Sequence, residues 1–326
     1  MTSSRLRIGV PVSLSGRHAR FGGQVRLGLE VWQSFHPAVE LIVEDDHSEP
    51  RSLDVVLPRL AGQCDLLLGP YSTQLMRRAG RIGAALDMLI WNHGGSGDDV
   101  QAANPGHVVS VQTPAGRYAE PFVRRLAESG DRSPLRIVSG KGRFALQVAE
   151  GAARAAHAVG IPVVFGGPVD DSWNLFCAGA FDEDVEVVRR AGRARTICAV
   201  AAGVREFGAA VDDPRGIYGV GQWFPGGAGE VTFGLSEREF VAAYERRTGV
   251  PPNYIAVQGV AAAIIATYCA ARAGGTGRAE LWSAAAGLEA ATLFGDFAID
   301  PGTGLQTAHR AVLTRWESQG PVAVAA

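Results

Sequence analysis

Leu6-Arg7-Ile8-Gly9-Val10-Pro11-Val12-Ser13-Leu14-Ser15-Gly16 is the stretch that decides the fold, because an apolar run ends in a serine–glycine turn and a helical pattern follows it. The apolar residues of that pattern return every three or four positions, at Phe21, Val25, Leu29 and Trp32. This period places them on one face of an amphipathic helix. A second apolar run at residues 39–44 completes a strand–helix–strand unit.

The alternation of strand and helix continues to residue 112 and then starts again. Apolar runs at 64–68, 88–91 and 108–111 alternate with helical patterns, and strands that are apolar throughout predict a parallel sheet covered on both faces. The segment Thr113-Pro114-Ala115-Gly116 breaks the pattern, and further strands are expected at 135–139, 163–165, 174–177, 196–200 and 217–224. Two such sets in 326 residues predict an α/β protein with two doubly wound lobes.

The remaining sequence predicts helices and a terminal hairpin. The pattern is helical from Glu237, with a break at 249–252, and residues 294–299 and 309–316 are expected to pair around a turn at 300–304. The most apolar helix, residues 257–271, is about 15 residues long and too short to span a bilayer, so no direct membrane insertion is expected.

The composition indicates a folded protein without a strong field for nucleic acid. Hydrophobic residues make up 47% and charged residues 20%, and the formal net charge is −2. No apolar signal stretch precedes the first strand, so we expect a cytoplasmic protein, or an extracytoplasmic one whose signal was removed. The four cysteines lie in apolar segments and are expected to be buried free thiols, with a Cys177–Cys198 disulfide as the alternative.

Ligands of doubly wound sheets bind beyond the carboxyl ends of the strands, so the loops after the third and fourth strands are the candidate site. Glycines let backbone amides approach a ligand, and a hydroxyl beside a helix start favours a carboxylate or amide. The alternative is that the glycines only form a turn and that Thr73 only caps its helix. The predicted ligand-binding residues of the two loops are Tyr71, Ser72, Thr73, Trp91, Asn92, Gly94, Gly95 and Ser96.

Aromatic side chains also gather at these strand ends. Aromatic rings with a few polar groups suit a small-molecule cleft, and core packing is the alternative for any single ring. Lys141 and Arg143 flank a loop of the second lobe, where they either meet a ligand's negative charge or face solvent. The aromatic candidates are Phe21, Trp91, Phe144, Phe181 and Trp223.

Motifs for catalysis are not found. A nucleophile elbow, Gly-x-Ser-x-Gly, fails at Asp98, there is no phosphate-binding loop, and the histidines lack the spacing of a zinc helix. Asp45-Asp46-His47 is interpreted as an exposed acidic loop rather than a cation site. We therefore predict a binding protein with no catalytic residues, cofactor or metal. A hydrolase that uses His93 and Ser96 is the enzymatic alternative.

Three segments resemble the leucine/isoleucine/valine-binding family of type I periplasmic binding proteins, which are ABC transporter substrate-binding proteins. They are residues 8–16 with Phe21-Gly22, Leu68-Gly69-Pro70-Tyr71-Ser72-Thr73, and Gly295-Asp296-Phe297-Ala298-Ile299-Asp300. The resemblance implies two ligand-binding lobes, residues 1–115 with 229–291 and 116–228 with 292–326, joined by a three-stranded hinge. It also implies that Thr73 and Gly94-Gly95-Ser96 hold the ligand's carboxylate, and that Phe21, Phe144 and Phe181 cover the ligand.

The resemblance predicts the function and also marks a departure. A small polar ligand (an amino acid, an amide or a carboxylate) would be captured between two closing lobes and passed to an ABC permease. The family includes a cytosolic amide sensor, so regulation of a partner protein is the alternative. Amino-acid binders of the family place an acid in the second lobe against the ligand's ammonium, whereas residues 201–204 here are Ala-Ala-Gly-Val. Glu183 and Glu206 are candidates to replace that acid, and a ligand without an α-ammonium is equally compatible.

Overall fold

The computed structural model describes residues 5–166, 173–191 and 194–324, and the chain divides into two compact units. The first unit holds Met1–Gln112 and Pro225–His309, and the second holds Thr113–Phe224 and Arg310–Ala326. The first two boundaries lie close to those expected from the sequence. The third lies at 309/310 instead of 291/292, because residues 292–309 pack with the first unit.

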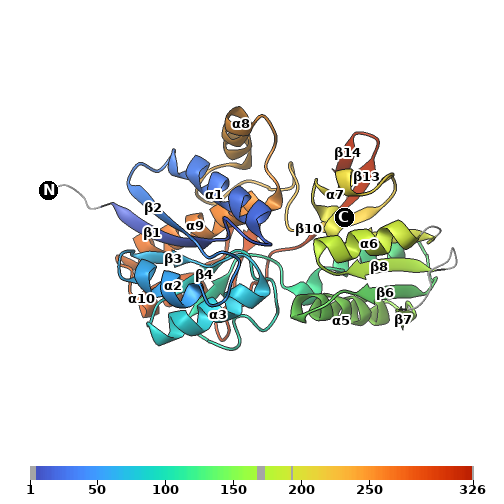
Figure 1. Cartoon of the computed structure of the whole chain (residues 1–326). Helices are drawn as coiled ribbons and strands as arrows, with labels where there is room; N and C mark the ends of the chain where they lie inside the picture. Colours follow the sequence, from blue (N-terminus) through green and yellow to red (C-terminus); the bar gives the residue numbers. More distant parts are fainter. Residues whose placement is uncertain (1–4, 167–172, 192–193, 325–326) are drawn as a thin grey trace. The chain divides into compact units, whose positions relative to one another are not determined.

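The first unit is built on a five-stranded parallel sheet with helices on both faces (Figure 1). Its elements are β1 (Leu6–Val12), α1 (Ala19–Gln33), β2 (Val39–Asp45), α2 (Leu53–Ala61), β3 (Leu66–Leu68), α3 (Thr73–Ala85), β4 (Ile90–Asn92), β5 (Val108–Ser110), α8 (Glu237–Thr248), α9 (Tyr254–Ala273), α10 (Arg278–Ala286), β11 (Ala290–Thr292) and β12 (Gly295–Phe297). The strand order is β2-β1-β3-β4-β5. Helix α1 packs against α9 on one face, and α2 packs against α3 on the other. The doubly covered parallel sheet predicted from the sequence is confirmed.

Helix α9 is longer than the sequence pattern predicted. It has 20 residues, and its length and apolar composition alone would suffice to cross a membrane. In this protein 78% of its most apolar window is buried, which is the environment of a core helix. Its close contact with α1 depends on Gly28, where an added Cβ would lie 2.8 Å from the Ala256 carbonyl oxygen.

The second unit contains a sheet in the order β14-β13-β10-β9-β8-β6-β7, in which β13 and β14 run antiparallel. Its elements are η1 (Ala115–Arg117), α4 (Glu120–Glu128), β6 (Leu135–Ser139), α5 (Arg143–Ala158), β7 (Val163–Phe165), β8 (Asn174–Ala178), α6 (Phe181–Ala191), β9 (Thr196–Ala199), η2 (Ala201–Gly203), α7 (Phe207–Ala210), β10 (Tyr218–Gly221), β13 (Val312–Glu317) and β14 (Gly320–Ala323). The parallel part, β7-β6-β8-β9-β10, repeats the winding of the first sheet.

Strand β8 shows why the alternative of a disulfide is wrong. Phe176 packs into the core under α4 and α5, whereas Cys177 packs into the core under α6. Cys198 lies opposite Phe176 in the strand register and shares its core. Successive residues of a strand point to opposite faces, so the Cys177 and Cys198 thiols lie on different sides of the sheet. All four cysteines are buried and free, as predicted.

The predicted C-terminal hairpin is wrong. Strand β12 pairs with β11, and β13 pairs with β10 and β14. The turn itself is present, since the Gly304 amide donates to the Asp300 carbonyl at 2.8 Å. The turn residues were therefore interpreted correctly, but the strands on either side of them belong to different units.

Two buried glutamines form hydrogen bonds with the backbone close to the boundaries between the two units. The Gln222 side chain accepts from the Thr113 amide at 2.9 Å and donates to the Thr113 carbonyl at 3.1 Å. Gln306 donates to the Val111 carbonyl at 3.0 Å. Both side chains are almost fully buried and satisfy backbone groups where strand pairing ends.

Candidate ligand-binding site

The carboxyl ends of the five parallel strands meet at one edge of the first sheet. In the order β2-β1-β3-β4-β5, the connections after β1 and β3 leave toward opposite faces, which opens a crevice between these two strand ends. Residues 13–18 after β1 and residues 69–72 after β3 flank this position. The loops selected from the sequence, after β3 and β4, lie at this same edge of the sheet.

The loop after β3 is bound to the loop after β4. Tyr71 forms a parallel β-bridge with Gly94, and the Ser72 amide donates to the Gly94 carbonyl at 3.0 Å. Ser72 has φ 99° and ψ 146°, a backbone conformation that side-chain-bearing residues rarely adopt. Strain of this kind persists where the surrounding structure imposes it, and it is common at functional sites.

Thr73 keeps a hydrogen-bond donor at this edge. It is the first residue of α3, and its Oγ1 accepts from the Gly97 amide at 3.0 Å. The hydroxyl hydrogen remains able to donate to a ligand oxygen. The helix cap is Ser72, whose Oγ accepts from the Leu75 amide at 3.3 Å, so the alternative that Thr73 is only a cap is wrong.

The loop after β4 is organised around the buried side chain of Asn92. Asn92 Oδ1 accepts from the amides of Gly94 (3.2 Å) and Gly95 (2.8 Å), and Nδ2 donates to the Gly95 carbonyl (2.8 Å) and to Ser110 Oγ (2.6 Å). Gln112 Nε2 adds a second donor to the Gly95 carbonyl at 2.9 Å. The Gly94 and Gly95 amides therefore point to Asn92, and the amide cradle expected for a ligand is not formed by these two groups.

Glycine is required in this loop because the protein packs closely around it. An added Cβ at Gly94 would lie 2.7 Å from Tyr71 Cα, and one at Gly95 would lie 2.4 Å from Met76 Cβ. The glycines therefore leave room for the loop after β3 and for the first turn of α3, which pack against them. Ser96, which is half-buried, is the polar side chain that follows them.

Trp91, a predicted ligand-binding residue, and His93, the proposed base of the hydrolase alternative, both face the interior. Trp91 is completely buried, and His93 is 1% exposed. Burial lowers the pKa of His93 to about 4, and the Gly69 backbone beside the ring opposes that shift only in part. Neither ring nitrogen of His93 forms a well-directed hydrogen bond with a described residue, so the imidazole does not activate Ser96.

Phe21 and Tyr71 do come together at the crevice. Their ring centroids lie 4.8 Å apart, and the ring of His18 meets Tyr71 edge-on at 5.9 Å. Arg17, in the loop after β1, donates to Oε1 of Gln74 in the first turn of α3 at 2.7 Å. His18 is not among the site residues predicted from the sequence. Its position between the serine–glycine turn and α1 was the available signal.

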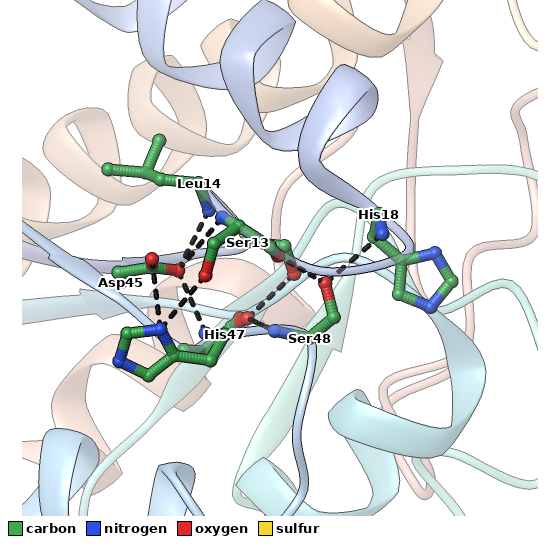
Figure 2. Close-up of polar contacts among 8 residues, drawn as sticks. Ser13, Leu14, His18, Asp45, His47 and Ser48 are labelled. Carbon is green, nitrogen blue, oxygen red and sulfur yellow. Dashed lines mark hydrogen bonds and ion pairs between the residues drawn. The ribbon is translucent and has the colours of Figure 1, made fainter.

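The loop after β1 is held in place by the loop after β2 (Figure 2). Asp45 Oδ1 accepts from the amides of Leu14 (2.9 Å) and His47 (2.8 Å), and Ser13 Oγ donates to Asp46 Oδ1 at 2.6 Å. Burial raises the pKa of Asp46, which is fully buried rather than exposed as expected. In the described part of the chain, no three His, Cys, Asp or Glu side chains are arranged to hold a metal ion.

Two adjacent acids fix the loops at the carboxyl edge of the second sheet. Glu183 accepts from the amides of Lys141 (3.0 Å) and Ala180 (2.9 Å), and Asp184 accepts from the Ala201 amide (2.9 Å). Burial raises the pKa of Asp184 to about 7, although backbone amides oppose this shift. Both acids therefore serve the loops of their own unit.

The aromatic candidates of the second unit divide into two groups. Trp223 is buried, as core packing requires. Phe144 and Phe181 stay partly exposed at the first turns of α5 and α6, and Phe144 meets Tyr118 edge-on at 5.6 Å. These two rings remain candidates for ligand contact.

The two wound sheets, with a chain that passes between them three times, define the fold of type I periplasmic binding proteins. The chain is similar to the leucine-binding protein LivK of Thermotoga maritima, with a TM-score of 0.82, 16% identity and 98% of each chain covered. It is also similar to LivJ of Streptococcus pneumoniae in complex with isoleucine (TM-score 0.78, 13% identity, 98% and 99% covered) and to a Rhodopseudomonas palustris solute-binding protein in complex with benzoate (0.78, 17%, 98% and 95%). No family model and no curated protein matches the chain. At these identities the likeness establishes the fold.

Proposed function

We propose that this protein captures a small ligand with a carboxylate or amide group and delivers it to an ABC importer, without catalysing a reaction. The observation that carries the proposal is Thr73, a hydroxyl donor fixed at the carboxyl edge of the first sheet beside the strained Ser72 and the ring of Tyr71. The similar structures named above are transport or solute-binding proteins, which supports the same role.

The second unit favours a ligand without an α-ammonium group. Both oxygens of Glu183 already accept backbone amides, and Ala201 and Ala202 are apolar and buried. A buried ammonium needs an acid to offset its desolvation. Carboxylates such as benzoate, or neutral amides, need none.

A thermal-shift screen of benzoate, hydroxybenzoates, leucine, isoleucine and aliphatic amides tests the proposal, because a ligand that binds only the folded state raises the melting temperature. Thr73→Ala and Phe144→Ala should each weaken the response to a hit. Thr248→Ala, at the end of α8 where its hydroxyl donates to the Tyr244 carbonyl at 2.9 Å, is the matched control. A hit whose response is unchanged in both test variants would place the site elsewhere. Permease and ATPase genes beside the coding gene would support delivery to an importer, and a regulator gene would favour sensing.

A further inference from the structure

Three rings form a continuous cluster at the β1/β3 crevice. Tyr71 lies between Phe21 and His18, with centroid distances of 4.8 Å and 5.9 Å. Phe21 and Tyr71 provide apolar faces, whereas His18 is the member with ring nitrogens that can bond a polar ligand atom. Because this is the switch point of the sheet, His18 stands where a ligand of such a fold is expected.

The fold holds the His18 backbone firmly (Figure 2). The His18 amide donates to Ser48 Oγ at 3.1 Å, and Ser48 Oγ in turn donates to the Ser15 carbonyl at 2.7 Å. The Ser48 amide donates to the buried Asp46 at 2.8 Å. His47 and Ser48 both have positive φ, 55° and 59°, which two consecutive non-glycine residues adopt only under constraint. The position of His18 is therefore set before any ligand arrives.

The ring of His18 has an unmatched polar atom. Its Nε2 is shielded from solvent and forms no hydrogen bond with any residue that the structure describes. Buried polar atoms are normally paired, because an unpaired one has lost its hydrogen bonds to water without replacement. A ligand oxygen placed at this nitrogen would provide that replacement.

The charges around His18 favour a negatively charged ligand. Arg17 and Arg20 flank it on its own element, Arg20 lies over the Phe21 ring at 4.5 Å, and Tyr71 faces it from the β3 loop. From the loop after β2, Ser48 bonds the His18 amide, and the carboxylate of Asp46 accepts hydrogen bonds from Ser13 and Ser48. Burial, and then the two arginines, lower the pKa of His18 to about 4, so the ring is neutral at pH 7. A negatively charged ligand would offset the arginines.

We propose that His18 is a ligand-contact residue that bonds the carboxylate of the captured ligand and takes up a proton from solvent as the complex forms. The inference rests on the proposed function and narrows its ligand to a carboxylate. A carboxylate beside the ring favours the imidazolium, so affinity should increase as the pH falls from 7 toward 5.

Histidine NMR on the full chain tests this directly. With ¹³C-labelled histidine, the His18 signal is assigned by its loss in His18→Gln and followed from pH 4 to 8 with benzoate, 4-hydroxybenzoate, leucine or isoleucine, and with benzamide as the neutral match to benzoate. At least one carboxylate should raise the pKa of His18 by about two units or more, from about 4 to about 6 or above, and benzamide should not. His18→Gln should weaken binding of that carboxylate about tenfold at pH 5 and remove the pH dependence of its affinity, whereas His157→Gln, on the exposed end of α5, should change neither.

The outcomes separate the inference from the proposed function. If a carboxylate raises the melting temperature while the His18 signal and its pKa stay unchanged, the inference is wrong and the proposed function stands. If benzamide binds and no carboxylate changes the His18 signal, the inference is also wrong and the proposed function also stands. If no carboxylate of the panel moves the signal, His18 is not the contact proposed, and the thermal screen alone then decides the proposed function.

Discussion

The side-chain amide of Gln222 forms a reciprocal pair of hydrogen bonds with the backbone of Thr113, 109 positions away in sequence. Gln222→Ala would remove both of these hydrogen bonds to buried backbone groups of Thr113, so we expect the free energy of unfolding to fall by about 1–3 kcal/mol. Urea denaturation and exchange of the Thr113 amide measure the effect. The exposed Gln63→Ala is the control, and equal stability of the two variants would contradict this role.

Gly95→Ala tests whether the glycines of the β4 loop serve packing. The added methyl would overlap Met76, so we expect a loss of about 1–3 kcal/mol in stability even without ligand. Gly23→Ala in α1 meets no atom within 4 Å and should raise stability by up to about 1 kcal/mol. Thermal unfolding of both variants decides, and a neutral Gly95→Ala would restore the view that the glycine exists for ligand approach.

Ser72 combines a helix cap with a strained backbone, and two substitutions separate the contributions. Ser72→Ala removes the cap and keeps the strain, so stability should fall by about 0.5–2 kcal/mol. Ser72→Gly removes the strain and loses little capping energy, so it should be neutral or stabilising. If glycine destabilises as much as alanine does, the positive φ carries no strain.

Asp184 makes stability depend on pH in a defined direction. Its pKa is raised from 3.8 to about 7 in the folded protein, so its contribution is complete below about pH 4 and is lost as the pH rises through 7. The difference in stability between wild type and Asp184→Asn, measured by denaturation from pH 4 to 8, isolates this group from the other acids. We expect that difference to change across the range, and a constant difference would show that Asp184 titrates normally.

The sequence predicted the sheets because their signal is local. Apolar runs and helical periods indicate which side chains are buried. Val25, Leu29 and Trp32, which define the first helical period, are buried as predicted. The C-terminal pairing failed because β13 finds its partner β10 far away along the chain, which no turn residue encodes. Within the site, Asn92 was selected correctly as a member of the loop, but its role was not. Whether the Gly94 amide points to a ligand or to Asn92 depends on backbone direction, which residue identity does not determine.

The burial of the four cysteines has a practical consequence for spectroscopy. Burial raises the pKa of Cys64 to about 11 and of Cys269 to about 12, and it raises those of Cys177 and Cys198 well above the ordinary value. Alkylating dyes react with the thiolate, so these native thiols should label slowly. One cysteine introduced on the surface, for example Gln63→Cys, would then react selectively. The wild-type background can thus carry a single fluorescent reporter without prior removal of its own sulfhydryl groups.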